Sequence, residues 1–285
     1  MRNYEHPWKA EDPYLDMDYA TRQLGFSNQI PLWKLQRMYE SFDDIQLLLT
    51  EIKSNRSQTL LEVGCSTGEL FRYVSNFCKH LGYTGIDISK NAIAFAREAY
   101  PRGKFSSCEM DMSDVIQILG ERPEILICRD VLLHQVAPFS FLKKLIEIPS
   151  KSAVIRLRTR DVGETVTDPN ISCQWDVGNR WIPYMVLNVD EMVDLIKETI
   201  SFEKLIIVKN YIVLGGENKR YLTKDLYFPE TGTAETSVFI EMGNGDSSRG
   251  DIDIEVRQKR KVRYTMFDRI RERVGRIWHY NLRLS

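Results

Sequence analysis

The sequence predicts an α/β fold with a mostly parallel sheet and helices on both of its faces. Short apolar runs alternate with amphipathic segments between residues 55 and 242, which is the pattern of such a sheet. Glycines bracket the turn after the first apolar run, and a helix-forming segment follows directly. The chain has 285 residues, of which 43% are hydrophobic, and this suffices for one well-buried domain with extensions or for two small domains.

The turn after the first apolar run organises the rest of the chain. Residues 59–71 read TLLEVGCSTGELF. An apolar strand reaches Glu62, Gly64 and Gly68 bracket a tight loop, and a helix begins. Glycine adopts backbone conformations closed to other residues and lets a ligand approach the main chain. The N–H groups at the start of the helix point to the same place. The loop therefore predicts a ligand site, with a plain tight connection as the alternative.

This loop resembles the first motif of the Rossmann-like, S-adenosylmethionine-dependent methyltransferases, which reads acid-x-Gly-x-Gly-x-Gly. Glu62 stands at the acid, Gly64 and Gly68 stand at the outer glycines, and Ser66 replaces the middle glycine. The serine weighs against a dinucleotide-binding loop, in which a Gly-x-Gly-x-x-Gly turn approaches a pyrophosphate. The resemblance implies S-adenosylmethionine as the cofactor, with Cys65 among the loop residues that contact it.

The resemblance extends over residues 55–242 and implies a seven-stranded, doubly wound sheet whose last strand is antiparallel. Residues 83–89 form the second strand, and Asp87 lies 25 positions after Glu62, close to the return distance of a βαβ unit. In the family, an acid at this position accepts both ribose hydroxyls of the adenosine, and Ile88 follows it in the turn. The alternative is that Asp87 caps the next helix.

The ends of the third and fourth strands complete the predicted cofactor site. After a third strand at residues 105–110, the resemblance assigns Asp111 to the adenine amino group and Met112 to the flank of the adenine ring. A buried fourth strand at residues 124–129 ends in Arg129, on the edge where sheets of this kind bind ligands. Charged side chains at four successive strand ends favour the methyltransferase interpretation over chance.

The loop after the fourth strand supplies the candidate catalytic residues. Its Val-Leu-x-His segment ends in His134 and resembles the family segment beside the methyl donor. A hydroxyl acceptor needs a general base, and imidazole exchanges a proton near neutral pH; a histidine of the core is the alternative. Asp130 is the second candidate base, and Asp176 and Tyr184 are candidates from a later insertion. A carboxylate or amine acceptor needs no strong base.

The insertion covers residues 161–188 and is rich in tryptophan, tyrosine and amide side chains. Such groups stack on and hydrogen-bond to a sugar-like or planar acceptor, or else they hold the insertion itself in place. Before it, Arg156, Arg158 and Arg160 alternate along a fifth strand and therefore share one side of it. They predict either a site for an acidic substrate or a solvated face.

The two ends of the chain form separate regions in the predicted organisation. Residues 1–54 are an irregular arm followed by a helix at 30–52, which covers the cofactor pocket or packs at the sheet edge. Residues 243–285 are a linker and a tail with ten basic side chains against three acidic ones from Glu255 onward. The amphipathic pattern at 257–283 predicts a helix that contacts an anionic membrane surface, a partner or its own domain.

The composition of the chain limits the possible partners, metal sites and locations of the protein. The net charge of -1 excludes a global field that attracts nucleic acid, and we expect no nucleic-acid partner. Five cysteines without a Cys-x-x-Cys pair predict neither a zinc site nor a disulfide framework. The N-terminus lacks the apolar core of a signal peptide, and no segment reaches about 18 apolar residues. We therefore expect a cytoplasmic protein without a metal, held at most at the inner membrane surface through its tail.

The sequence thus predicts transfer of a methyl group from S-adenosylmethionine to a small-molecule or glycan-linked acceptor, as an O-methylation. The acceptor class rests on the aromatic insertion and the basic tail. Two alternatives stay open: a binding module that keeps the cofactor pocket without catalysis, and an N-methyltransferase of a small amine. A nicotinamide oxidoreductase is disfavoured by Ser66.

Overall fold

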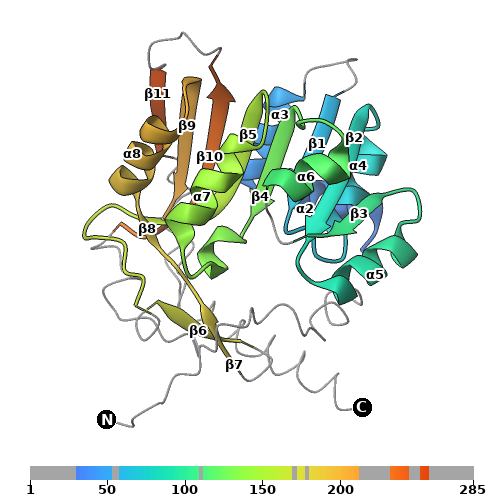
Figure 1. Ribbon diagram of the computed structural model, residues 1–285, viewed down its shortest axis with the longest axis horizontal. Helices are drawn as coiled ribbons and strands as arrows, with labels where there is room; N and C mark the ends of the chain where they lie inside the picture. The colour runs from blue at the N-terminus through green and yellow to red at the C-terminus, as the bar shows by residue number, and fades with distance from the viewer. Residues whose placement is uncertain are drawn as a thin grey trace.

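A twisted sheet lies between two layers of helices in the computed structural model of the chain (Figure 1). The structure describes residues 30–52, 58–108, 112–168, 172–176, 180–211, 232–243 and 251–256. None of the helices in these ranges combines the length and the apolar character that crossing a membrane requires.

Nine strands in the described residues form the main sheet, in the order β11-β9-β10-β5-β4-β1-β2-β3, with β8 beside the end of β5. Neighbouring strands are parallel except at β10, which runs antiparallel to both β5 and β9. Two further strands, β6 and β7, form a separate antiparallel hairpin. The strands are β1 (Gln58–Val63), β2 (Leu81–Asp87), β3 (Lys104–Ser107), β4 (Ile125–Arg129), β5 (Ser152–Arg160), β6 (Cys173–Asp176), β7 (Arg180–Pro183), β8 (Leu187–Asn188), β9 (Phe202–Asn210), β10 (Ala234–Met242) and β11 (Asp251–Val256).

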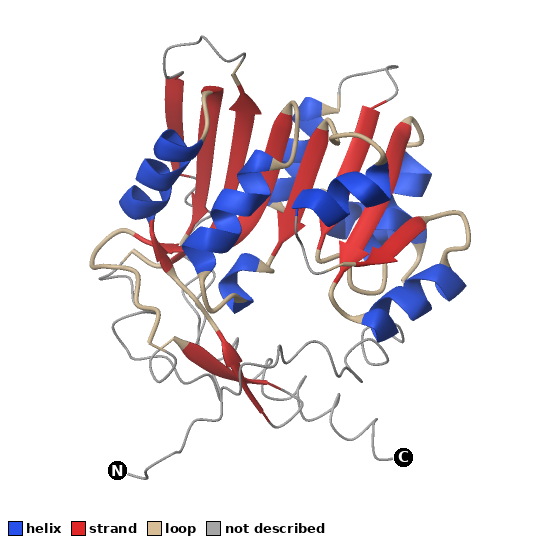
Figure 2. Ribbon diagram, viewed as in Figure 1, coloured by secondary structure: helices blue, strands red, loops and turns tan. Residues whose placement is uncertain are grey.

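Helices cover both faces of the sheet (Figure 2). The residues of α2 to α5 pack into one hydrophobic core, and those of α6 to α8 pack into the other. The helices are α2 (Leu32–Tyr39), α3 (Asp43–Glu51), α4 (Glu69–Phe77), α5 (Lys90–Ala99), α6 (Met112–Leu119), α7 (Pro138–Glu147) and α8 (Val189–Thr199), with a 3-10 turn η1 (Leu132–His134).

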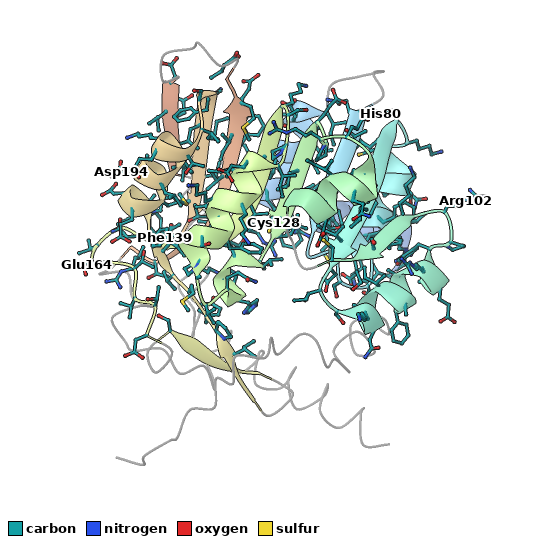
Figure 3. All side chains as sticks on the ribbon, in the orientation of Figure 1. His80, Arg102, Cys128, Phe139, Glu164 and Asp194 are labelled. Atoms are coloured by element: carbon teal, nitrogen blue, oxygen red, sulfur yellow. The ribbon has the colours of Figure 1, made fainter. Side chains whose placement is uncertain are left out.

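The central strands bury both of their faces, so successive side chains in each strand enter different cores. In β1, Leu61 and Val63 pack with α6 to α8, whereas Leu60 packs with the opposite layer. In β4, Cys128 packs with α6 to α8 and Ile127 packs with the opposite layer. Cys128 lies near the centre of the molecule in Figure 3. Burial on both faces explains why these parallel strands appear in the sequence as continuous apolar runs.

The carboxyl ends of β1, β2, β4 and β5 meet at one edge of the sheet, because these strands are parallel neighbours. Val63 pairs in register with Ile86 on one side and with Cys128 on the other. The residues that follow the three strands therefore emerge side by side. The β6–β7 hairpin lies beneath this edge in Figure 1. Ligands bind at such an edge in open α/β sheets.

The structure confirms the predicted α/β class and the antiparallel strand, but the main sheet has more strands than the predicted seven. The additional edge strand is β11, which pairs in parallel with β9 beyond residue 242, where the sequence predicts a linker and a tail. Its sequence DIDIEV alternates acidic and apolar residues, as a half-buried strand does. The turn-rich residues 243–250 before it are typical of a linker, so the strand stands isolated in the sequence. The small strands β6, β7 and β8 arise within the insertion.

The single helix predicted over residues 30–52 is in fact two helices, α2 and α3. Phe42 interrupts them with an extended backbone at φ -86° and ψ 135°. Asp43 and Asp44 follow at the start of α3, where carboxylates favour a new helix N-terminus. Apolar residues keep their spacing of three and four across the break, so periodicity alone did not reveal it.

Several predictions concern residues outside the described ranges and stay predictions. These are the arm up to residue 28, Asp111 and the basic tail at 257–283. Near Asp111, β3 ends at Ser107, three residues before the end predicted for the third strand, and α6 begins at Met112.

Candidate active site

The loop between β1 and α4 turns tightly because alternate residues take left-handed backbone angles. The angle φ is +78° at Gly64, +48° at Ser66 and +81° at Gly68. Serine visits this region at a cost of about 1–2 kcal/mol, which glycine avoids. The N–H groups of Gly64 and Cys65 both donate to the carbonyl of Ile86, at 2.8 and 3.0 Å. These bonds fix the loop to the end of β2.

Gly64 also allows two strand-end loops to touch. A Cβ atom at this position would lie 2.1 Å from Cγ2 of Val131, in the loop after β4. Real side chains do not approach so closely, so any larger residue at position 64 displaces Val131. The glycine therefore brings the ends of β1 and β4 together around one cavity.

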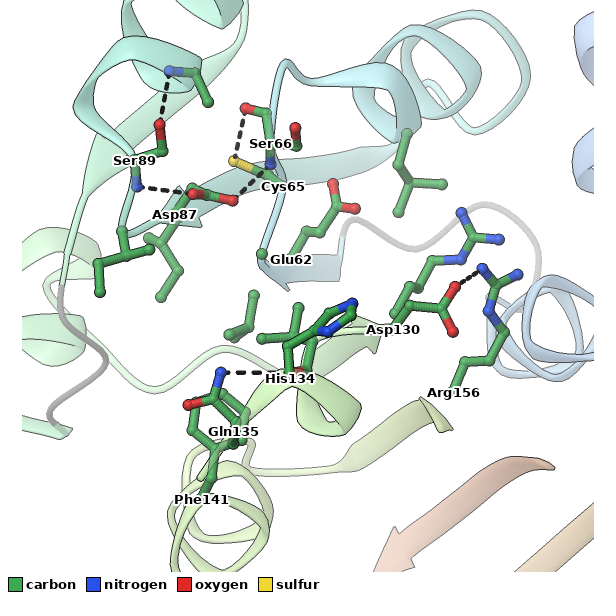
Figure 4. Close-up of a pocket in the computed structure, with 18 of the residues that line it drawn as sticks. Glu62, Cys65, Ser66, Asp87, Ser89, Asp130, His134, Gln135, Phe141 and Arg156 are labelled. Carbon is green, nitrogen blue, oxygen red and sulfur yellow. Dashed lines mark hydrogen bonds and ion pairs between the residues drawn. The ribbon is translucent and has the colours of Figure 1, made fainter. Parts of the chain in front are cut away.

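Asp87 ties the glycine loop to the turn before α5. Its carboxylate accepts the N–H of Ser66 and the N–H of Ser89, both at 2.8 Å (Figure 4). The cap of α5 is the Ser89 hydroxyl, which accepts the N–H of Ala92 at 3.2 Å. Asp87 therefore does not replace the helix cap, and its half-buried carboxylate lines the cavity.

A cavity of about 890 Å³ opens at the carboxyl edge of the sheet. Its lining comes from the glycine loop, the ends of β2 and β4, the start of α7 and the end of α2. Seven of the predicted cofactor residues line it: Glu62, Gly64, Cys65, Ser66, Asp87, Ile88 and Arg129. Gly68 lies at the N-cap of α4, outside the lining, and Met112 begins α6. The structure thus gathers most of the predicted cofactor residues around one space.

Glu62 is an unusual carboxyl group for this position, because it is only 5% exposed. Burial raises its pKa to about 7, while a hydrogen bond from the Tyr83 hydroxyl and the charge of Arg129 oppose the increase. Glu62 therefore changes its charge near neutral pH. This carboxyl group is part of the wall of the cavity.

Asp130 follows β4 with a left-handed backbone, at φ +57°. Its carboxylate pairs with Arg156 and, at 3.2 Å, with Nη1 of Arg158. Burial tends to raise the pKa of Asp130, but the charges of Arg156 and Arg158 outweigh it and lower the pKa to about 2. A carboxylate with that pKa holds almost no proton at neutral pH, which makes it a weak general base.

His134 lies in the η1 turn and projects into the cavity (Figure 4). Its Nδ1 lies 2.8 Å from the carbonyl oxygen of Pro183, at the end of β7. A carbonyl only accepts, so we assign the proton to Nδ1, and the lone pair of the neutral ring is then on Nε2. The N–H of Met185 donates to the carbonyl of Leu133 at 2.7 Å. Two main-chain bonds from the insertion therefore fix the histidine and its turn.

Of the other two catalytic candidates, Tyr184 does not line the cavity. Tyr184 is buried with Leu133 and Val186, and its ring meets the His134 ring edge to face at 6.4 Å. Arg158 donates a hydrogen bond to the Tyr184 hydroxyl oxygen, and this bond contributes to raising the pKa of the arginine, against its burial. Asp176 lies in β6, and its side chain falls outside the described part of the structure. Tyr184 thus packs against the ring of His134 without lining the cavity.

The three arginines of β5 do not form a solvated face, because each of them has a polar partner in the protein. Arg156 lines the cavity and pairs with Asp130, whereas Arg158 pairs with Glu235 of β10 at 3.1 Å as well as with Asp130. Arg160 donates from Nε to the carbonyl of Val162 at 2.6 Å, at the start of the insertion. Only Arg156 of the three reaches the cavity.

Sequence reasoning missed Asp44, which enters the site from α3. Its carboxylate is fully buried, accepts Nε of Arg129 at 2.5 Å and lies 3.7 Å from Nη1 of Arg156. Burial lowers the pKa of Arg129, but the Asp44 charge outweighs it and keeps the pKa above its usual value. The available signal was an acid placed four residues before Leu48, on the apolar side of an amphipathic helix. A charge on such a face implies a buried partner.

The comparisons with known proteins agree with this geometry. A family model for a methyltransferase domain matches residues 54–213, more than half of the chain. The candidate methyltransferase 235L of Invertebrate iridescent virus 6 is 22% identical over 125 residues, which are 41% of this chain and 46% of the viral protein. The match thus spans just under half the length of that curated relative.

The solved structures that resemble the chain have little sequence in common with it. A TehB-like SAM-dependent methyltransferase from Corynebacterium glutamicum has a TM-score of 0.43 and 14% identity, covering 79% of this chain and 96% of its own. The N-terminal domain of EvdMO1 with SAH bound has a TM-score of 0.46 and 11% identity, covering 75% and 82%. The assignment of the chain rests on the family model. The chain belongs to the family of methyltransferase domains that the model describes, within the class I, S-adenosylmethionine-dependent methyltransferases.

Proposed function

We propose that this methyltransferase methylates a hydroxyl oxygen of a small-molecule or glycan-linked acceptor, with His134 as the general base. The observation that carries the proposal is the orientation of His134. Its ring lies in the cavity that the cofactor-loop residues also line, and the carbonyl of Pro183 holds the Nδ1 proton. A backbone carbonyl that fixes the tautomer in this way leaves Nε2 as the nitrogen that accepts a proton from an acceptor hydroxyl.

The lining of the cavity fits S-adenosylmethionine. Glu62, Glu69 and Asp87 place carboxyl groups around the glycine loop, and these attract the sulfonium and ammonium groups of that cofactor. Asp87 is the residue that would hold the ribose hydroxyls. The cofactor, when bound, supplies an electrophilic methyl group on sulfur. The residues of the chain hold donor and acceptor in contact, exclude water and receive the proton.

The size of the cavity supports a small acceptor group. Its volume of about 890 Å³ falls in the upper part of the roughly 300–1,000 Å³ range of small-molecule sites. A nucleoside cofactor fills much of that space, so the remainder admits a small molecule or the terminal group of a larger glycan. Tyr39 and Phe42 give this remainder aromatic walls, on which a sugar ring or a planar group packs.

The cofactor is tested first. Calorimetry with S-adenosylmethionine, S-adenosylhomocysteine and NAD is expected to show binding of the first two and none of NAD. Binding of NAD instead would contradict the proposed cofactor.

The acceptor chemistry is tested next, by release of S-adenosylhomocysteine over a panel of hydroxyl, carboxylate and amine acceptors. We expect His134→Gln to lower the rate with hydroxyl acceptors by about 100- to 10,000-fold, because that is the usual contribution of a general base. The matched control is His80→Gln, since His80 precedes β2 and does not line the cavity.

Three outcomes separate the alternatives. Unchanged turnover in His134→Gln contradicts the role of the histidine. Transfer to amines alone points to the N-methyltransferase. Cofactor binding without turnover on any acceptor of the panel favours the binding module.

A further inference from the structure

We propose that Asp44 is a positioning residue that holds Arg129 and Arg156 in the cavity wall and cancels positive charge that would otherwise repel the sulfonium cofactor. The inference rests on the proposed use of S-adenosylmethionine. It assigns a role to a residue of the N-terminal region that lies before residues 54–213, the part matched by the family model.

The geometry places one carboxylate between two arginines of neighbouring strands. Asp44 is 0% exposed, and its Oδ2 accepts Nε of Arg129, at the end of β4, at 2.5 Å. Its Oδ1 lies 3.7 Å from Nη1 of Arg156, in β5. Both arginines line the cavity, whereas Asp44 stands behind them. A single side chain from α3 thus fixes two cations at the place where β4 and β5 end.

Aromatic rings of the N-terminal region cover the same guanidinium groups. The Arg129 guanidinium lies 5.2 Å from the ring centre of Tyr39 and 5.0 Å from that of Phe42, and Arg156 lies 5.0 Å from Phe42. Nη2 of Arg129 and Nε of Arg156 are buried without a hydrogen-bond partner. A ring face stabilises a cation by only about 0.5–2 kcal/mol. The carboxylate of Asp44 therefore carries most of the compensation at Arg129, and it shares the compensation of Arg156 with Asp130.

The charges of this cluster balance. The positive charges of Arg129, Arg156 and Arg158 stand against the negative charges of Asp44, Asp130 and Glu235. A change of Asp44 to a neutral residue leaves one positive charge in excess. The Arg129 charge also acts on Glu62, in the glycine loop, where it lowers the pKa of that carboxyl group. The excess charge would therefore act at the cofactor. S-adenosylmethionine carries one positive charge more than S-adenosylhomocysteine, so the ratio of their affinities reports this charge.

The experiment measures both affinities by calorimetry in the wild type and in Asp44→Asn, which keeps the shape of the side chain. We expect the variant to lose about five- to tenfold in affinity for S-adenosylmethionine beyond any loss for S-adenosylhomocysteine. Coulomb's law gives this order for one unit charge across a partly solvated cavity. Asp44→Glu keeps the charge, and we expect it to retain the wild-type ratio. Adding Arg156→Gln to Asp44→Asn removes the excess charge, and we expect the ratio to return towards that of the wild type.

The matched control is Glu51→Gln. Glu51 lies in the same helix, pairs with Lys151 at 2.5 Å and does not line the cavity, so we expect the affinity ratio to stay unchanged. Equal losses for both cofactors in Asp44→Asn indicate a merely structural role and overturn the inference, as does an unchanged ratio. If Asp44→Asn does not fold, Arg156→Gln gives the test with the opposite sign, because it removes a positive charge and favours S-adenosylmethionine. A wild type that binds neither cofactor refutes the proposed function itself.

Discussion

A comparison of Gly64 with Gly120 tests whether the cavity loop needs a residue without a side chain at position 64. Both have a left-handed backbone, with φ of +78° and +79°, but a Cβ would strike Val131 at Gly64 and meets nothing within 4 Å at Gly120. Replacement of either by alanine costs about 1–2 kcal/mol of backbone strain. We expect Gly64→Ala to cost about 1–3 kcal/mol more from the clash.

Urea unfolding measures the two losses, and calorimetry measures cofactor binding in the same variants. Because Val131 lines the cavity, we expect Gly64→Ala to lose binding and Gly120→Ala to keep it. Equal stability losses would show that the loop after β4 yields to the added methyl group.

Glu62 makes stability depend on pH in an unusual direction. Its pKa rises from 4.5 to about 7 in the folded protein, so between these values the folded state holds a proton that the unfolded state has released. Its contribution is therefore most favourable below pH 4.5 and declines as the pH rises towards 7. The shift corresponds to about 3 kcal/mol, as an order of magnitude.

The measurement compares the free energy of unfolding of the wild type and Glu62→Gln at pH 5 and pH 7.5. We expect the wild type to lose stability relative to the variant as the pH rises. Tyr83→Phe removes the hydrogen bond that lowers this pKa, and we expect it to move the decline to higher pH. The lowered pKa of Asp130, about 2, acts below pH 4 and leaves this window clear. A parallel dependence in wild type and Glu62→Gln would contradict the assignment.

At the residue scale, local sequence pattern predicted the strand-end residues but not their distant partners. Glu62, Asp87 and Arg129 each follow an apolar run, so the topology of a parallel sheet brings them to one edge. Asp44 reaches Arg129 across 85 positions of sequence, and no local periodicity records such a contact. The roles of Glu62 and Asp87 at the cofactor stay predictions, although both residues line the cavity.

Among the elements, α8 shows how one side chain secures the end of the insertion. Asn188 is the N-cap of α8, and its Oδ1 accepts the N–H groups of Asp190 and Glu191 at 2.8 and 3.1 Å. Its Nδ2 also donates to the carbonyl of Gly163 at 2.8 Å. We expect Asn188→Ala to cost about 1–2 kcal/mol through the lost cap.

Urea unfolding of Asn188→Ala and Asn188→Asp separates the two contributions. Aspartate keeps the cap oxygen and loses only the donor to Gly163, so we expect a smaller loss than with alanine. Identical losses in both variants would show that the contact with Gly163, rather than the cap, secures this end of the insertion.

The element boundaries were predictable where a chemical stop was present. Asn188 caps the start of α8, and Pro101 follows shortly after the end of α5 at Ala99. The break between α2 and α3 has no proline or glycine. It arises from packing, because Phe42 turns to cover Arg129 and Arg156.

At the scale of the whole molecule, β11 makes the edge of the sheet depend on residues after Gly243. It pairs with β9 along residues 251–256, and its acidic side chains suit an exposed edge. A chain that ends at Gly243 leaves β9 as the edge strand. We expect that chain to lose about 1–3 kcal/mol of stability and to self-associate, because unpaired strand edges template pairing with other chains.

A chain that ends at Val256 is the control, since it keeps β11 and removes only the residues beyond it. Chemical unfolding and size-exclusion chromatography compare the two truncated chains with the full chain. Self-association of both chains to the same extent would assign the effect to the residues after Val256 instead of to the strand.

The central parallel strands followed from the sequence because apolar runs buried on both faces have few other arrangements, whereas the edge strand β11 did not. The chemistry of the acceptor did not follow, because it depends on which loops meet above the sheet edge. His134 illustrates this: its place after β4 was predictable, but its hydrogen bond to Pro183 joins residues 49 positions apart.

That hydrogen bond has a consequence for protein engineering. The insertion orients His134 through a carbonyl of Pro183 and an N–H of Met185, which are main-chain atoms. Both contacts therefore do not depend on which side chains stand at these two positions, as long as the backbone keeps its path. We expect variants of the insertion that keep these two main-chain contacts to keep the orientation of His134.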